Sequence, residues 1–125
     1  MSTPTLAEAL MQYGRDAYLL TMADDGPHTS FVSVDLKGNV ITCAIGKTAA
    51  RNIDGKSNVS LFWPPREPGG YALLVNGAAT ARHEPSGAAR AEITLTKSVL
   101  HRPGPRLPDS DGPCASDCKR IAAPA

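Results

Sequence analysis

Turn-forming residues recur along this chain at such short intervals that long helices cannot fit between them. Asp24-Asp25-Gly26-Pro27 and Lys37-Gly38-Asn39 are two such clusters, and each separates two short apolar runs. Glycine accepts positive φ and proline lacks a backbone donor, so these clusters end one element and start the next. Short apolar runs between close turns are typical of antiparallel sheets. The chain is therefore expected to be mainly β.

The apolar runs predict six strands and one or two short helices. Tight turns join the first three runs, which indicates an antiparallel meander. A small antiparallel barrel satisfies this pattern best, because closure removes exposed strand edges. The predicted strands are Ala17–Met22, His28–Leu36, Val40–Ile45, Val59–Trp63, Tyr71–Arg82 and Glu92–His101.

A short helix is expected near the N-terminus. Thr3 or Thr5 can cap its start, and Gly14 ends it. Its apolar face is predicted to hold Leu6, Leu10 and Met11.

The C-terminal part of the chain differs from the rest in composition. We expect a barrel domain over residues 1–103 and a tail over 104–125, rich in Pro, Gly, Asp and Ser, that forms loop or disorder. Within the barrel, Gly77 interrupts a long apolar run and predicts a bulge or a close backbone approach.

Composition excludes several classes of function. The chain has 125 residues, a formal net charge of +1 and 5% aromatic residues. A nucleic-acid-binding domain normally carries a basic excess and stacking aromatics, so no nucleic-acid partner is expected. No apolar run reaches membrane-spanning length, and the first residues lack a charged start followed by an apolar core. We expect a single-domain cytoplasmic protein without a membrane partner.

The segment Val40–Trp63 carries the strongest site signal. It reads as strand, short helix over residues 48–55, and strand, with Lys47, Thr48 and Arg51 where the helix begins. A helix start offers unpaired N–H groups, and the cations add charge, so the pattern predicts an anion cradle. The alternative is a solvated helix start capped by Thr48. Asn52 either contacts a ligand or tethers the helix backbone.

Three other residues are candidates for a binding groove. His28 and Ser30 follow a turn and could hydrogen-bond a ring or substrate, although a His beside Pro in a turn is often simply exposed. Trp63 could stack on a planar ligand, or serve as a core or interface aromatic.

The cysteines leave open whether the chain binds a metal. Cys114 and Cys118 have three residues between them and could bind a metal with His101 or Asp117. They could equally form a redox-labile pair, or be incidental to the tail. Cys43 lies in a predicted strand and is expected to be a buried apolar residue.

Four stretches together resemble the pyridoxamine 5′-phosphate oxidase-like split barrels, which bind flavin or deazaflavin. They are GPHTSFVSVD in the second strand, KTAARNIDGKSNVSLFW after the third, YALLVNGAATAR in the fifth and LTKSVLHRP in the last. The resemblance covers roughly residues 6–103. It implies a six-stranded antiparallel split barrel and a homodimer with its cofactor in a groove between subunits.

The same resemblance suggests a function. It implies an oxidoreductase that uses FMN, or alternatively a deazaflavin coenzyme, to pass hydride to a small organic substrate. The alternative is a non-catalytic flavin- or haem-binding module. Second-strand cations of the founding oxidase align with Ser30 and Asp35, and a loop lysine aligns with Ala49, so Lys47, Thr48 and Arg51 are left for the phosphate. No nucleophile–base pair is evident, so no catalytic residue is singled out; in flavin proteins the cofactor carries the hydride chemistry.

Overall fold

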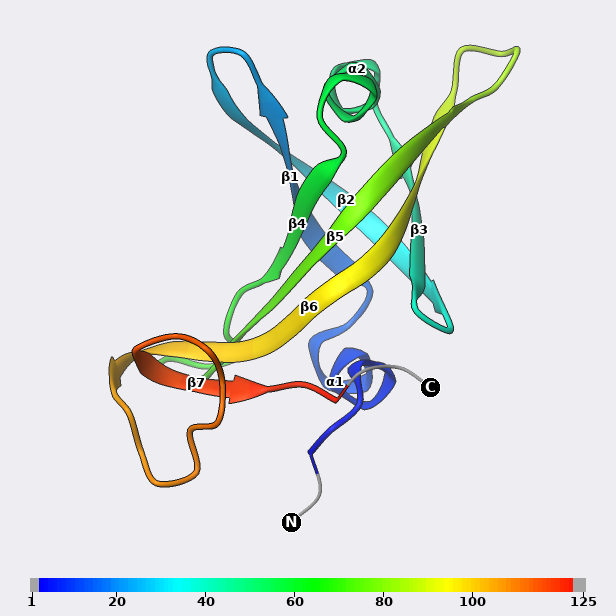
Figure 1. The fold of residues 1–125 in the computed structure, drawn as a ribbon. Helices are drawn as coiled ribbons and strands as arrows, with labels where there is room; N and C mark the ends of the chain where they lie inside the picture. The colour runs from blue at the N-terminus through cyan, green and yellow to red at the C-terminus, as the bar shows by residue number, and fades with distance from the viewer. Residues whose placement is uncertain (1–2, 123–125) are drawn as a thin grey trace.

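The computed structural model describes residues 3–122, which form two helices and seven strands (Figure 1). The six predicted strands are all present, each within a few residues of its expected bounds. The elements are α1 (Leu6–Tyr13), β1 (Asp16–Ala23), β2 (Gly26–Lys37), β3 (Val40–Ile45), α2 (Lys47–Gly55), β4 (Asn58–Trp63), β5 (Ala72–His83), β6 (Ala89–Pro105) and β7 (Ser116–Arg120).

Six strands close into a ring, which confirms the mainly β, six-stranded split barrel. The strand order is β3-β2-β1-β4-β5-β6, and a further pairing of β3 with β6 closes it. Every pairing is antiparallel, and Val40 lies opposite Thr94 where the ring closes. The register shifts at Asn76/Gly77, where Thr96 of β6 is the extra residue, so the bulge is on β6 and Gly77 is the predicted site of close backbone approach.

Alternate residues of the strands fill the barrel. In β2, for example, Val32 and Val34 are buried while Phe31 and Ser33 are exposed. This period of two explains why Phe31 stands out of phase with its apolar neighbours. The largest fully buried apolar side chains are Trp63, Leu6, Leu19, Ile41, Leu61, Leu73, Ile93, Val34 and Val75.

Helix α1 begins as the sequence predicts. Thr5 is its N-cap and forms a capping box with Glu8, while Gly14 follows its last residue with a φ of 82°. Leu6 is buried as expected. Met11 is 87% exposed, so the prediction that Met11 lies on the apolar face was wrong. The helix presents Leu6, Ala9, Leu10 and Tyr13 to the core, at positions i, i+3, i+4 and i+7.

The tail contains a strand, so loop or disorder was the wrong prediction for residues 116–120. β7 pairs antiparallel with the far end of β6, and His101 lies opposite Cys118. Ala122 then bridges Thr5 in parallel, which brings the two ends of the described chain together (Figure 1). The predicted tail also includes residues 123–125, which lie outside the described residues.

A buried carboxylate anchors β7. Asp117 is buried and accepts hydrogen bonds from Ser110 Oγ (2.7 Å), Tyr71 Oη (2.8 Å) and Arg102. Burial alone would raise the pKa of this carboxyl, but the three donors outweigh it and lower the pKa to about 2. Asp117 is therefore a structural anion whose carboxylate is already engaged by these three donors.

Helix α2 covers one end of the barrel. It packs against β1, β5 and β6 and sits between the β1–β2 and β5–β6 hairpins (Figure 1). His83 Nε2 on β5 lies 2.9 Å from Asp54 Oδ2 on the helix.

Within residues 3–122, no helix is long and apolar enough to cross a membrane.

Candidate functional site

The predicted cations lie on the exposed side of α2. Lys47 and Arg51 are four residues apart, so they share one helix face, and both are exposed. The helix begins at Lys47, after Gly46, which has no side chain to cap it. Thr48 is already inside the helix, so the interpretation of Thr48 as its cap was wrong. The first turn therefore keeps N–H groups and positive charge available to an anion.

Asn52 is part of the helix–barrel contact. Its side chain is buried, and Nδ2 donates to Thr21 Oγ1 on β1 at 3.1 Å. A buried amide that pairs with a buried hydroxyl fixes the helix on the barrel. This contact supports the interpretation that Asn52 tethers the helix.

Two candidate residues on β2 carry unpaired polar atoms. Within the described residues, the buried atoms His28 Nδ1 and Ser30 Oγ have no hydrogen-bond partner. They are two positions apart and therefore face the same side of the strand. Buried polar atoms are normally hydrogen-bonded, so these two atoms are suited to pair with a water or with a polar group of a ligand.

Trp63 lies in the core. Its side chain is 1% exposed, and Nε1 donates to the Gly14 carbonyl at 3.0 Å. The burial supports a core role, because a ligand on the barrel surface cannot reach the face of this ring.

The outer side of the barrel carries a cross-strand aromatic row. Direct pairing places Phe31 opposite Tyr18, Tyr18 opposite Phe62, and Phe62 opposite Leu74. Phe31 is 63% exposed and Tyr18 40% exposed, with ring centroids 5.1 Å apart. An apolar row of this kind on one face indicates an interaction surface.

A groove of about 440 Å³ lies beside this aromatic row. In the next cross-strand row, Leu20, Ser60, Asn76 and Lys97 follow one another by direct pairing. Ser60 Oγ donates to Asn76 Oδ1 at 2.7 Å. The groove is lined by Leu20, Met22, Pro27, Asn58, Val59, Ser60, Asn76, Gly77 and Thr96.

The sequence analysis missed these groove residues. Their signal is that Asn58, Ser60 and Asn76 place polar side chains at the outward positions of apolar strands. The strand register is needed to see that they meet. Apolar walls with a few amide and hydroxyl groups are typical of small-molecule sites.

A second hollow, of about 400 Å³, adjoins the groove at Met22. Arg51, Asn52 and Lys56 from the α2 region line it, together with Asp24 and Asp25 from the β1–β2 turn. Arg51 is thus the predicted cradle residue that lies nearest the groove. Lys47 and Thr48 belong to the opposite end of the helix.

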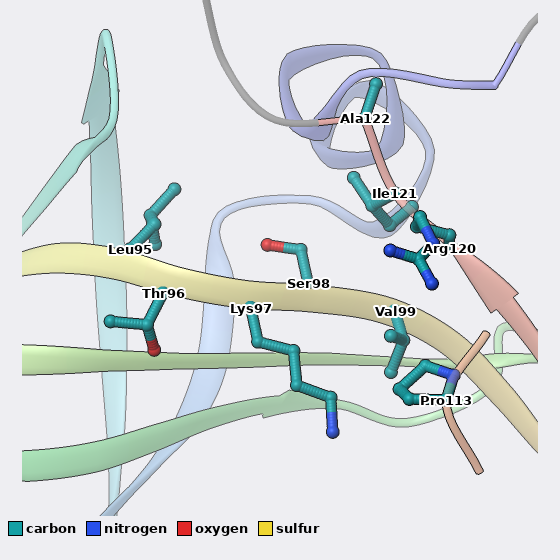
Figure 2. A pocket seen from close by; sticks show the side chains of 9 residues that line it. All are labelled: Leu95, Thr96, Lys97, Ser98, Val99, Pro113, Arg120, Ile121 and Ala122. Carbon is teal, nitrogen blue, oxygen red and sulfur yellow. The ribbon is translucent and has the colours of Figure 1, made fainter.

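Another pocket, of about 420 Å³, lies along β6 and the chain after β7 (Figure 2). Thr96 lines both this pocket and the groove. Lys97 and Arg120 point to opposite sides of the β6 ribbon in Figure 2, so the two cations do not converge on one anion. Lys97 lines this pocket and is also the direct cross-strand partner of Asn76, which lines the groove.

Asp35 has a partner of its own. Arg15 Nη2 pairs with Asp35, and Arg15 Nε donates to the Val34 carbonyl at 2.9 Å. This carboxylate is thus paired with a cation at the other end of β2 from His28.

The three cysteines occupy different environments. Cys43 is buried in the barrel wall as expected, and burial raises the pKa of its thiol to about 11 although the charge of Arg90 acts in the opposite direction. Cys114 and Cys118 are joined as a disulfide, and His101 Nδ1 lies 3.3 Å from Cys114 Sγ. Asp117, the other proposed metal ligand, is held by Ser110, Tyr71 and Arg102 instead.

Comparison with solved structures defines the class of fold. A candidate pyridoxamine 5′-phosphate oxidase of Listeria innocua superposes with a TM-score of 0.62 at 15% identity, over 74% of this chain and 92% of that one. The haem storage protein HutZ of Vibrio cholerae gives 0.59 at 11% identity, over 74% and 92%. An F420 reductase gives 0.58 at 17% identity, over 73% and 94%. The chain has the split-barrel fold of the pyridoxamine 5′-phosphate oxidase-like proteins.

Comparison of sequences defines the family. No family model matches the chain. The uncharacterized protein Mb0449c of Mycobacterium bovis is 32% identical over 134 residues, which covers 95% of this chain and 93% of that protein. MT0457 of Mycobacterium tuberculosis matches with the same figures. The chain belongs to the family of these two mycobacterial proteins.

Proposed function

We propose that this protein is an oxidoreductase that binds FMN, or alternatively a deazaflavin coenzyme, in a groove at a homodimer interface. It would act on a small organic substrate in the cytoplasm. The observation that carries the proposal is the outer face of the barrel, where an exposed aromatic row borders a groove with amide and hydroxyl groups. The fold supports it, because one structural neighbour is named an F420 reductase and another a candidate pyridoxamine 5′-phosphate oxidase.

The groove suits a flat ring with polar edges. Leu20 and Met22 offer apolar contact, and Asn58, Ser60 and Asn76 offer donors and acceptors at one side. On its own it is open to solvent along one side. A second subunit that covers the aromatic row would bury a ring lying there and exclude water from it.

Two cations mark the ends at which a cofactor phosphate could lie. Arg51 lies beyond Met22 at one end, and Lys97 lies opposite Asn76 at the other. Asp24 and Asp25 share the hollow with Arg51 and weaken its pull on an anion. The cradle of Lys47, Thr48 and Arg51 remains our proposal for the phosphate, with Lys97 as a further candidate.

When bound, flavin or deazaflavin supplies hydride transfer. The chain's own residues would orient the cofactor and shield it from water. The amides of Asn58 and Asn76 would fix the ring edge. His28 and Ser30 face the other side of β2, with the buried Val32 and Val34, so they would meet a ligand group inside the barrel wall and not in this groove.

Ligand titration tests the binding step. With riboflavin phosphate or the deazaflavin coenzyme at about 100 times its dissociation constant, unfolding should be stabilised by about 2.7 kcal/mol. Arg51→Gln and Lys97→Gln should each reduce affinity if their cations hold the phosphate, whereas Lys37→Gln, at the opposite end of β2 from Pro27, should not. Unchanged affinity in both Arg51→Gln and Lys97→Gln would remove both cations from the site.

The dimer is tested at Phe31. The wild-type protein should have twice the mass of one chain by light scattering, because the aromatic row needs a partner. Phe31→Glu places a charge at the most exposed aromatic residue of that row and should give a monomer that still folds, since the side chain is 63% exposed. Ser86→Glu is the control, exposed in the turn between β5 and β6 and away from the aromatic row. A wild-type monomer, or a Phe31→Glu dimer, would contradict the proposed interface.

A second candidate function is non-catalytic binding of haem or flavin. Its support is His28, because an imidazole is a common haem ligand and this one has an unpaired nitrogen. HutZ shares the fold and is named a haem storage protein. A haem spectrum that disappears in His28→Ala would favour this function.

A further inference from the structure

Three metal-binding side chains meet where β6 and β7 pair, away from the proposed cofactor groove. His101 Nδ1, Cys114 Sγ and Cys118 Sγ all lie within 4.8 Å of one another. They come from three segments: β6, the loop before β7, and β7 itself. His101 and Cys118 are direct cross-strand partners, so the sheet register holds two of the three donors together.

The loop that carries Cys114 is held by its own hydrogen bonds. Arg106 donates to the carbonyls of Ser110, Gly112 and Cys114, so one guanidinium organises the turn. Gly112 N donates to the Cys118 carbonyl at 2.8 Å. A Cβ at Gly112 would lie 2.5 Å from Cys118 Sγ, so only glycine lets the loop approach this sulfur. The donors are thus brought together by contacts that do not depend on the bond between the sulfurs.

The spacing of the donors suits zinc. In a tetrahedral zinc site, neighbouring sulfur and nitrogen ligands lie about 3.3–3.8 Å apart. His101 Nδ1 and Cys114 Sγ are already 3.3 Å apart. The two sulfurs, joined in the disulfide, must separate. Cys118 is buried, while His101 and Cys114 are half-buried, so a fourth position would face solvent.

We propose that the reduced Cys114–Cys118 pair and His101 form a zinc site with three protein ligands and one open position. The disulfide is the oxidised, metal-free state of the same site. Its reduction breaks the S–S bond, adds two electrons and two protons, and leaves two thiols. Zinc binding then displaces those two protons to solvent as the thiolates coordinate the metal. Soft thiolate ligands favour zinc over magnesium or calcium.

Zinc titration of untagged protein tests the site. The disulfide is first reduced with a water-soluble phosphine, which becomes the phosphine oxide by taking the oxygen of water. Reduced wild-type protein should then retain one zinc ion per chain after gel filtration. Protein left oxidised should retain none. A reduced wild type that retains no zinc would overturn the proposal.

Variants assign the ligands. Cys114→Ser and His101→Ala should each weaken zinc binding by more than about tenfold, since even outer-shell partners are worth about 10–100-fold. Cys43→Ala and His83→Ala are the matched controls and should bind as wild type. Cys114 is only half-buried, so its variant should fold, which far-ultraviolet circular dichroism checks. Equal zinc affinity in wild type, Cys114→Ser and His101→Ala would show adventitious binding and contradict the site.

Discussion

Replacing Trp63 with alanine should destabilise the protein by about 3–5 kcal/mol. The side chain is the largest of the fully buried residues, and its indole N–H is bonded to the Gly14 carbonyl. The change removes both the packing of β4 against α1's end and this hydrogen bond. It leaves a cavity that the closed barrel cannot easily collapse. Because domains are stable by only about 5–15 kcal/mol, much of the protein could unfold near body temperature.

Urea unfolding followed by circular dichroism measures this effect. Met11→Ala is the matched control: its side chain is apolar but 87% exposed, so its change should stay within about 0.5 kcal/mol. Trp63→Phe should fall between the two, because it keeps an aromatic ring and loses the N–H. A Trp63→Ala protein as stable as Met11→Ala would contradict the core position of this ring.

Replacing Gly77 with alanine should destabilise the barrel by about 1–3 kcal/mol. The added Cβ would lie 2.5 Å from Ile93 Cγ2 and 2.7 Å from the Thr94 carbonyl oxygen. Ile93 is fully buried and Thr94 contributes backbone, so neither can move without disturbing the β5–β6 pairing. The effect should therefore be near the upper end of that range. Gly77 also lines the groove, so ligand affinity should fall with stability.

Gly55→Ala is the control for this substitution. It sits in the last turn of α2 without positive φ, and no described atom lies within 4 Å of its added Cβ. Alanine there should be neutral or stabilising by up to about 1 kcal/mol, since it restricts the unfolded chain. Equal stability of the two variants in thermal and urea unfolding would argue against the tight contact at the bulge.

The sequence predicted the barrel well because local signals agree with one another. Val40–Ile45 was found at its observed bounds, since an apolar run lies between a Gly-Asn turn and Gly46. The close backbone approach at Gly77 and the helix cap at Thr5 each follow from the chemistry of one residue. These are local features, and tertiary structure did not override them.

The predictions that failed concern features that depend on contacts between residues far apart in the sequence. β7 reads SDCKR, which has no apolar alternation. It forms because Asp117 meets Arg102 from β6 and Tyr71, which lies just before β5. The groove depends on strand register, which places Ser60 and Asn76 side by side. The sequence alone leaves open whether Trp63 faces a ligand or is buried in the core. Only the path of β4 in the structure decides between these two positions. The convergence of His101 on the cysteine pair likewise needs the β6–β7 register.

The absorption spectrum of freshly purified, untagged protein tests the central proposal most directly. The proposal predicts a flavin or deazaflavin band that stays with the protein through gel filtration, or that appears with a rise in melting temperature when the cofactor is added. A haem band would favour the alternative function, non-catalytic binding of haem. A spectrum without any cofactor band, together with no change in melting temperature on addition of riboflavin phosphate or deazaflavin, would contradict the account.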